Sequence, residues 1–345
     1  MQTGQIRYDL FADRHVIIAP QRMRRPDFPE AWPTLPNSAE CPFCEGREHL
    51  TPPEIFALRD NSPPNTPGWR TRVVPNRFLA LAVETPCRPI EAPATGEGYE
   101  GFGAHEILID SPEHRFDPRL LRTRDARAWL WSLRERLRDL RHDSRLRYFA
   151  LFKNHGRAAG ASQPHPHTQI VAMPLVPAPA LARLQRAHAW YKAHGQNPFD
   201  AAVREAGEGG RLIAESDRFA LIAPYAPRFA YETVLVAKHG VPVALWEMDD
   251  PLLDEAAALY TALMRAAGAG MGDFPFNLTF NTPPAQPFGD EALWHELSYY
   301  WRFALTLSPR LYGAGGLEAA EGIPLNPVPP EAAARRLAET IKEYL

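Results

Sequence analysis

Several features that would place this 345-residue chain in a specialised class are scarce or missing. It has 3 cysteines, too few for a disulfide scaffold. Lysine occurs at four positions only, and the arginines are spread along a chain of net charge −3, so we expect no nucleic-acid partner and no polybasic membrane segment. No apolar run approaches the ~20 residues of a membrane helix, and the chain does not open with a basic segment followed by an apolar one. These absences predict a soluble, cytoplasmic protein without a membrane partner.

Proline, in contrast, is abundant. The 36 prolines gather in segments where they prevent long helices and mark loops or edge strands. Between these segments one order of elements is predicted twice. The first copy comprises strands 78–83 and 106–110, a helix that begins near Asp125 as its N-cap, strand 148–152, a glycine-rich turn and a further strand. The second comprises strands 219–222 and 233–237, a helix, and strands 276–280 and 300–307.

This repeated order predicts an α+β fold with two half-domains, residues 1–205 and 206–345. The helix of the first copy is the clearest element, because Trp129, Leu133 and Leu137 recur at helical spacing. A second helical stretch at 178–193 and a glycine-rich seam at 206–210 separate the halves.

The segment from Asn154 to Gln169 is the most informative for chemistry. It reads Asn-His-Gly-Arg-Ala-Ala-Gly-Ala-Ser-Gln-Pro-His-Pro-His-Thr-Gln, so it leaves one strand, turns on glycines and enters another. Alternate side chains of an extended chain share a face, which places His165, His167 and Gln169 together. Two surface histidines in a loop would explain the spacing alone. The backbone N–H groups of the glycine-rich turn and the polar Ser162 favour a phosphate site instead.

This segment resembles the galactose-1-phosphate uridylyltransferases of the histidine-triad superfamily, and the resemblance extends over nearly the whole chain. It implies two histidine-triad-like half-domains, each a mostly antiparallel sheet with packed helices. It also implies that His167 attacks the α-phosphorus of a nucleotide sugar, forming a covalent nucleotidyl-histidine that a second phosphate acceptor resolves. A neutral imidazole with a pKa near ~6.5 is a competent nucleophile for such a step.

The resemblance assigns further roles to residues of this sequence. Gln169 and Ser162 would bind phosphate oxygens during catalysis, and Asn154 would hold the phosphate or the ribose. Other expected substrate contacts come from Asn76, Gly160, Arg22, Arg25 and Glu318. Asn76 could instead initiate a turn, and the two arginines could form a solvated cluster or a subunit interface. His105 also resembles a family position, but a half-buried structural histidine is the favoured interpretation.

A metal site is expected beside the nucleophile. Cys41 and Cys44, separated by two residues, match with His114 and His165 the zinc-binding pattern of many family members. Two thiolates and two imidazoles make a closed tetrahedral site, so the zinc would be structural. The alternative is a pair of reduced, buried cysteines with a capping His114. The second metal site of some relatives has no ligand set here, and we expect one zinc per chain.

The acceptor segment departs from the family pattern. Leu317 precedes Glu318 where the family has an aromatic residue, and no lysine lies nearby. Galactose 1-phosphate is therefore a doubtful acceptor. The first hypothesis is uridylyl transfer between UDP-glucose and a hexose 1-phosphate, in a homodimer. The alternatives are adenylyl transfer to phosphate from ADP-glucose or adenylylsulfate and, in another class, a non-catalytic zinc-stabilised binding protein.

Overall fold

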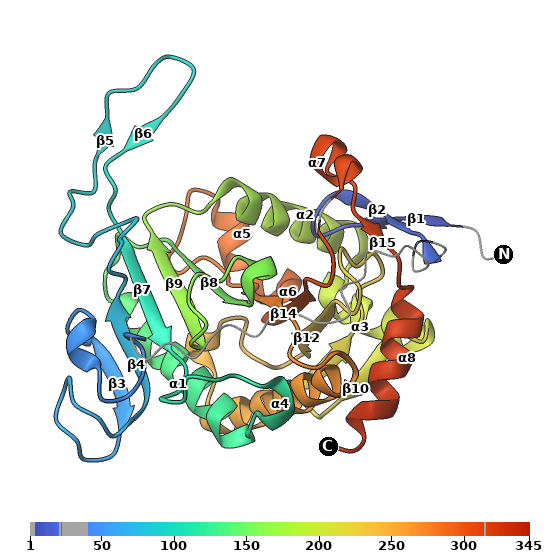
Figure 1. Ribbon diagram of the computed structural model, residues 1–345. Coiled ribbons are helices and arrows are strands. Elements are labelled where there is room, and N and C mark those ends of the chain that lie inside the picture. Colours follow the sequence, from blue (N-terminus) through green and yellow to red (C-terminus); the bar gives the residue numbers. More distant parts are fainter. Residues whose placement is uncertain (1–3, 21, 23–40, 314) are drawn as a thin grey trace.

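A large antiparallel sheet forms the centre of the molecule (Figure 1). The computed structural model describes residues 4–20, 22, 41–313 and 315–345. The sheet contains β3 (Phe56–Arg59), β4 (Trp69–Pro75), β7 (Ala104–Ile109), β8 (Tyr148–His155), β9 (His167–Met173), β10 (Leu212–Glu215), β11 (Phe219–Ile222), β12 (Thr233–Ala237), β13 (Phe276–Phe280) and β14 (Ala304–Pro309). Its 10 strands lie in the order β10-β11-β12-β14-β13-β8-β9-β7-β4-β3, and every neighbouring pair is antiparallel.

The strand order shows the internal repeat. From one edge inward it reads β3-β4-β7-β9-β8, and from the other β10-β11-β12-β14-β13. Helix α1 (Thr123–Leu140) connects β7 to β8 as α4 (Asp250–Met271) connects β12 to β13. The predicted α+β fold is confirmed, and the repeated element order is present with β4 in place of the strand expected at 78–83. The copies meet where β8 pairs with β13, for example Phe276 opposite His155, so they share one sheet. The boundary expected after residue 205 falls inside α3 (Pro198–Glu208), and the division into half-domains stays a prediction.

Helices cover the two faces of the sheet unequally. On one face, α1 and α4 pack with α8 (Pro330–Ile341) in the main core, where Leu133 and Leu137 are fully buried. On the other face, helices cover the C-terminal strands: α2 (Ala178–His194), α3, α5 (Glu291–His295) and α6 (Leu297–Tyr300). No helix packs there on β7 and β9 among the described residues. This second face of the N-terminal strands is where His167 lies.

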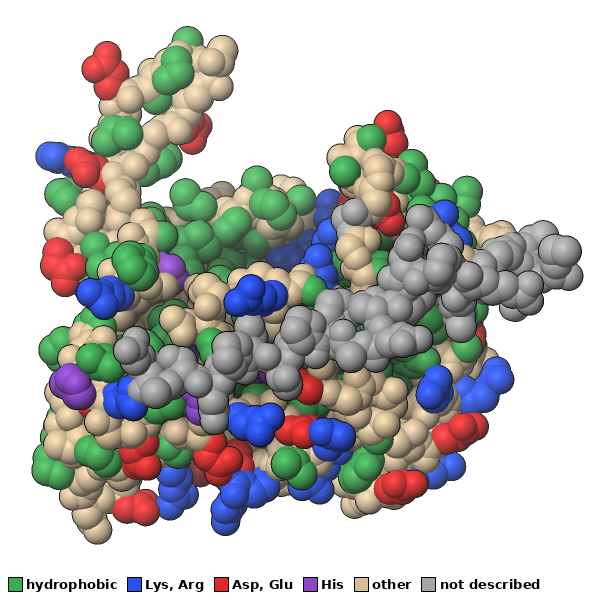
Figure 2. Space-filling model, in the orientation of Figure 1, with side chains coloured by type: hydrophobic (Ala, Val, Ile, Leu, Met, Phe, Trp, Pro, Cys, Tyr) green, Lys and Arg blue, Asp and Glu red, His purple; other side chains and the backbone are tan. Residues whose placement is uncertain are grey.

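Smaller elements surround the sheet. Strands β1 (Gln5–Asp9), β2 (Arg14–Ile18) and β15 (Leu325–Asn326) form a side sheet, next to α7 (Gly316–Glu321). An arm carries β5 (Pro89–Ile90) and β6 (Gly98–Tyr99) away from the body. Short 3-10 helices are η2 (Glu48–Leu50), η3 (Pro118–Leu120), η4 (Arg157–Ala159) and η5 (Leu245–Glu247). On the face drawn in Figure 2, basic and acidic side chains are interspersed. None of the helices in the described ranges has the length and apolar character to cross a bilayer.

Three local predictions are wrong. The strand expected at 78–83 is irregular, because Asn76 turns the chain after β4 by accepting a hydrogen bond from the Phe78 N–H at 2.9 Å. The strand expected at 300–307 begins only at Ala304, since Tyr300 ends α6 and is buried in the second core cluster. Asp125 lies inside the first turn of α1 and is not its N-cap; Arg122 occupies that position without a side-chain cap.

Candidate active site and metal group

His167 is the first residue of β9 and is 5% exposed. Its Nδ1 lies 2.8 Å from the backbone carbonyl of His165. Because a carbonyl oxygen only accepts, Nδ1 must donate, and the neutral ring keeps its lone pair on Nε2. Burial lowers the pKa of His167, although the same hydrogen bond works in the opposite direction. The side chain is therefore held as an oriented, neutral imidazole.

A glycine-rich turn follows β8 and leads to the His-Pro-His segment. Gly156 and Gly160 have φ angles of 78° and 84°, which L side chains rarely adopt. A Cβ at Gly156 would also meet the Cβ of Pro275 at 2.8 Å. Between the glycines, η4 folds the backbone, and Ser162 is exposed in the loop that follows. The expected glycine-based turn is present, while the phosphate contacts of Ser162 and Gly160 stay predictions.

A row of amides crosses the sheet beside His167. The β8–β9 register places Lys153 opposite Thr168, so Asn154 and His167 are the next facing pair. Asn277 of β13 faces Asn154 and donates from Nδ2 to its Oδ1 at 2.8 Å and to the Ala159 carbonyl at 2.8 Å. No role for Asn277 was predicted from the sequence. Its place in the second copy of the repeat, inside a correctly predicted strand, was the available signal.

His105 lies next to two of the predicted site residues, Gln169 and Asn76. The Ala80 N–H donates to its Nδ1 at 3.2 Å, so the neutral ring carries its proton on Nε2. Nε2 therefore donates to Gln169 Oε1 at 3.2 Å, whereas Asn76 Nδ2, itself a donor, lies 3.0 Å from Nε2 and forms no hydrogen bond with this tautomer. Donation to Oε1 leaves the Gln169 amide N–H₂ available on the face of His167. His105 is half-buried, as expected, and its contact with Gln169 was not predicted.

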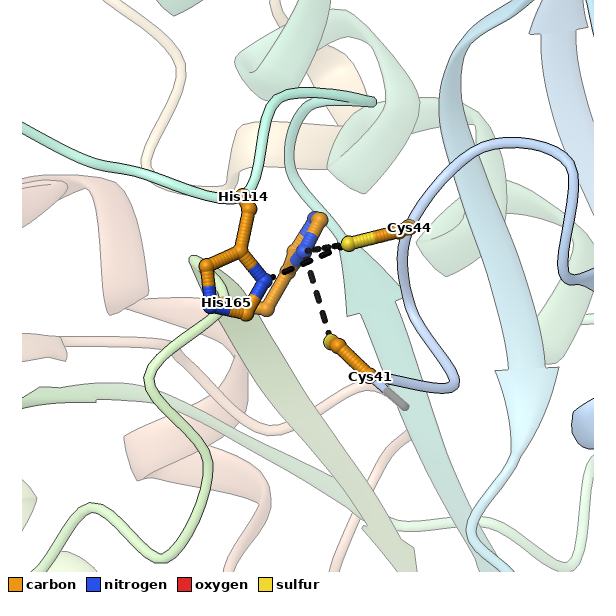
Figure 3. A group of neighbouring side chains, drawn as sticks. All are labelled: Cys41, Cys44, His114 and His165. Carbon is orange, nitrogen blue, oxygen red and sulfur yellow. Dashed lines mark hydrogen bonds between the residues drawn. The ribbon is translucent and has the colours of Figure 1, made fainter. Parts of the chain in front are cut away.

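The four predicted metal ligands lie together, and one of them, His165, is two residues before His167 in the chain (Figure 3). Their donor atoms all lie within 4.8 Å of one another, and Cys44 Sγ is 3.2 Å from His114 Nδ1. His165 Nε2 donates to the Ser111 carbonyl at 2.7 Å, which directs Nδ1 toward Cys41 and Cys44, 3.7 Å from each sulfur. Burial lowers the pKa of His165 to about 4, so the ring is a neutral ligand. Two sulfurs and two imidazoles at these separations fit a tetrahedral metal ion.

The remaining predicted contacts lie elsewhere. Arg22 is exposed beyond β2, and Arg25 is outside the described residues. In α7, the carboxylate of Glu318 accepts from the Gly315 N–H at 2.9 Å and from the Leu325 N–H at 3.1 Å. The side chain also lines a cavity of about 200 Å³ with Arg14, Arg228, Arg310 and Tyr312. Arg310 donates to Asn277 Oδ1 at 3.0 Å, which connects this cavity to the amide row.

The family model for the galactose-1-phosphate uridyl transferase N-terminal domain matches residues 2–177. This chain belongs to the galactose-1-phosphate uridylyltransferase family. An ADP-glucose phosphorylase of Arabidopsis thaliana is 29% identical over 98% of this chain and 93% of that protein. A galactose-1-phosphate uridylyltransferase of Thermotoga maritima is 26% identical over 97% of this chain and 98% of its own length.

Solved structures of the family agree with the fold. The crystal structure of the Arabidopsis ADP-glucose phosphorylase with bound ADP-glucose superposes with a TM-score of 0.80 at 28% identity, covering 98% of this chain and 99% of that one. A uridylyltransferase structure with a TM-score of 0.73 is 21% identical, covers 99% of both chains and supports the fold alone. The relatives transfer nucleotidyl groups, and this family member is a nucleotidyltransferase.

Proposed function

We propose that the chain transfers a nucleotidyl group by double displacement through His167. In the first step, Nε2 forms a bond to the α-phosphorus of a nucleotide sugar, and the bond from that phosphorus to the sugar phosphate breaks. In the second, a phosphate oxygen of the acceptor forms the new bond and the phosphorus–nitrogen bond breaks, which restores the neutral ring. The observation that carries this proposal is the hydrogen bond from His167 Nδ1 to the His165 carbonyl, because it reserves Nε2 for attack.

The donor we propose first is ADP-glucose, with phosphate as the acceptor. The similarity to the Arabidopsis ADP-glucose phosphorylase over 98% of this chain supports this choice. Leu317 in place of an aromatic residue also argues against strict recognition of a hexose. UDP-glucose with a hexose 1-phosphate acceptor is the second candidate, supported by the name of the matching family model.

The acceptor phosphate would bind in the cavity beside Glu318. Three guanidinium groups line it, and the Nε atoms of Arg14 and Arg310 are buried without a hydrogen-bond partner among the described residues. Buried, unsatisfied guanidinium N–H groups are suited to a phosphate, which accepts several hydrogen bonds. Two backbone N–H groups already occupy the Glu318 carboxylate, whose remaining lone pairs could accept from a sugar hydroxyl.

We propose zinc as the metal held by the Cys41, Cys44, His114 and His165 group, since thiolates and imidazoles suit that ion. The ion would fasten the loop of Cys41 to the start of β9 and so support the His165 carbonyl that orients His167. We further propose a cytoplasmic homodimer, with Arg22 and Arg25 as candidate contacts of the substrate phosphates or of the subunit interface.

The test is trapping of the labelled protein. The chain is incubated with ADP-glucose or UDP-glucose carrying a radioactive α-phosphorus, or with adenylylsulfate carrying a radioactive phosphorus, and protein-bound label is counted after denaturation. ADP-glucose should label the protein fastest, and added phosphate should discharge it. The variant His167→Ala should take up no label, whereas the exposed control His142→Ala should label normally. Undiminished labelling of His167→Ala would refute the mechanism, and faster labelling by UDP-glucose would favour the second candidate.

A further inference from the structure

A cavity of about 820 Å³ lies on the other face of the sheet from His167. The strand alternation of β9 places Thr168 on the face of α1, where Trp129 Nε1 donates to its hydroxyl at 2.8 Å. We call this space the rear cavity; its lining includes Asp110, Phe116, Trp129, Lys153, Arg157 and Tyr260. Its volume is in the range of small-molecule sites.

The floor of the rear cavity carries polar groups that are not fully satisfied. Lys153 Nζ lies 2.8 Å from Asp110 Oδ2, and the two side chains are 4% and 8% exposed. Despite this ion pair, Asp110 Oδ2 has no hydrogen bond of good geometry within the described ranges. Tyr260 is 3% exposed, and its hydroxyl forms no hydrogen bond with a described residue. Buried groups without partners are costly, so this floor is suited to a polar ligand.

The chemistry of the floor and walls matches a polyol. A sugar hydroxyl can donate to a carboxylate while it accepts from an ammonium group or a phenol. Burial and the nearby Asp110 carboxylate raise the pKa of Tyr260, so its hydroxyl remains a donor. The rings of Trp129 and Tyr260, with centroids 5.1 Å apart, and the ring of Phe116 supply the apolar wall that the C–H faces of such a ligand need.

The rim adds positive charge. Arg115 and Arg157 line the opening, are exposed and form no salt bridge with a described residue. The acidic groups of the rim already have partners: Asp117 pairs with Arg119, Asp125 and Glu113 with Arg122, and Asp273 with His155. The free guanidinium groups therefore favour a ligand that also carries a phosphate.

The rear cavity is connected to the catalytic strand. Asp110 Oδ1 accepts from the Thr168 hydroxyl at 2.9 Å, and the Asp110 N–H donates to the Pro166 carbonyl at 3.1 Å. Thr168 and Pro166 are the two neighbours of His167 in the chain. A ligand that engages Asp110 would thus act on a contact of each residue next to the nucleophile, the Thr168 hydroxyl and the Pro166 carbonyl.

We propose that the rear cavity is an effector site for a small phosphorylated polyol, which binds to Lys153 and Tyr260 and changes the reactivity of His167. The binding itself is independent of the proposed function; only the effect on His167 rests on it. Binding is measured by calorimetry and the effect on His167 by the labelling rate, so either part of the proposal can fail without the other.

Binding is tested by titration calorimetry with glucose 6-phosphate, glycerol 3-phosphate and inorganic phosphate. We expect a phosphorylated polyol to bind more tightly than phosphate, and Tyr260→Phe, which removes one hydroxyl, to weaken that binding about tenfold. The control Tyr299→Phe removes an exposed hydroxyl outside the rear cavity and should change nothing. Arg157→Gln, on the exposed rim, gives a second variant that does not disturb the core.

The effect on the nucleophile is tested by the rate of protein labelling from ADP-glucose. The bound polyol phosphate should change that rate several-fold in the unaltered chain and leave it unchanged in Tyr260→Phe. The proposed site would be overturned if no polyol phosphate bound at millimolar concentrations. It would also be overturned if Tyr260→Phe and Arg157→Gln each bound the ligand as tightly as the unaltered chain does. Binding without any change in the labelling rate, in a chain that does label, would overturn the effector role.

Discussion

The hydrogen bond between His105 and Gln169 can be tested by a double-mutant cycle. In His105→Phe a ring of similar size stays in place, but the Nε2 donor to Gln169 Oε1, now 3.2 Å away, is lost. The Ala80 N–H, which donates to the other ring nitrogen, is exposed and can be solvated. The net loss is thus that of one partly buried hydrogen bond, about 0.5–1.5 kcal/mol. This corresponds to a roughly 2- to 12-fold slower transfer to His167 if the amide of Gln169 acts in the transition state.

The assay is the single-turnover rate of protein labelling in four chains: the unaltered chain, His105→Phe, Gln169→Ala and the double variant. Because His105 is expected to act through Gln169, its replacement should slow labelling in the unaltered chain and have little further effect on Gln169→Ala. Replacement of the exposed His142 by Phe is the matched control. Two independent, multiplying effects would refute the positioning role of His105.

Three further predictions concern stability. Metal analysis should find about one zinc per chain, and Cys44→Ser or a chelator should lower the unfolding temperature more than the labelling rate; a metal-free, fully stable protein would contradict this. Burial raises the pKa of Glu232 to about 7, above its unfolded value, so stability should fall as the pH rises from about 5 to 7. In urea unfolding, Glu232→Gln should reduce the pH dependence of the unfolding free energy. An unchanged pH dependence in this variant would count against the role of Glu232. Glu106 and Arg136 form a buried bidentate pair at 2.6 and 2.7 Å. Glu106→Gln should therefore lower the unfolding free energy by about 3 kcal/mol, and a loss below about 1 kcal/mol would contradict the importance of this pair.

The sequence was most informative where a local pattern alone determines the structure. Strands 219–222, 233–237 and 276–280 were predicted with their observed bounds, because buried apolar runs between turn signals leave little choice. The metal group was also predictable, because the spacing of Cys41 and Cys44 indicates a metal site and the family resemblance supplies His114 and His165.

Other features depend on contacts that no local pattern encodes. Asn277 and Asn154 are 123 positions apart in the chain and meet only because β13 pairs with β8. His105 reaches Gln169 across the β7–β9 ladder, at a separation of 64 positions in the chain. The rear cavity is likewise assembled from β8, α4 and the loop after β7, so neither its volume nor its polar floor could be read from spacing.

The pairing of β8 with β13 has a consequence for any attempt to divide the chain. Backbone hydrogen bonds join the two copies of the repeat at this point, from Phe276 opposite His155 to Thr279 opposite Phe152. A fragment that carried one copy alone would expose a full strand edge, and exposed edges associate with other chains. We therefore expect two separately expressed halves, cut within α3, to be insoluble when alone and to recover a folded, nicked complex when mixed. Each half would then depend on the other to fold and to stay soluble.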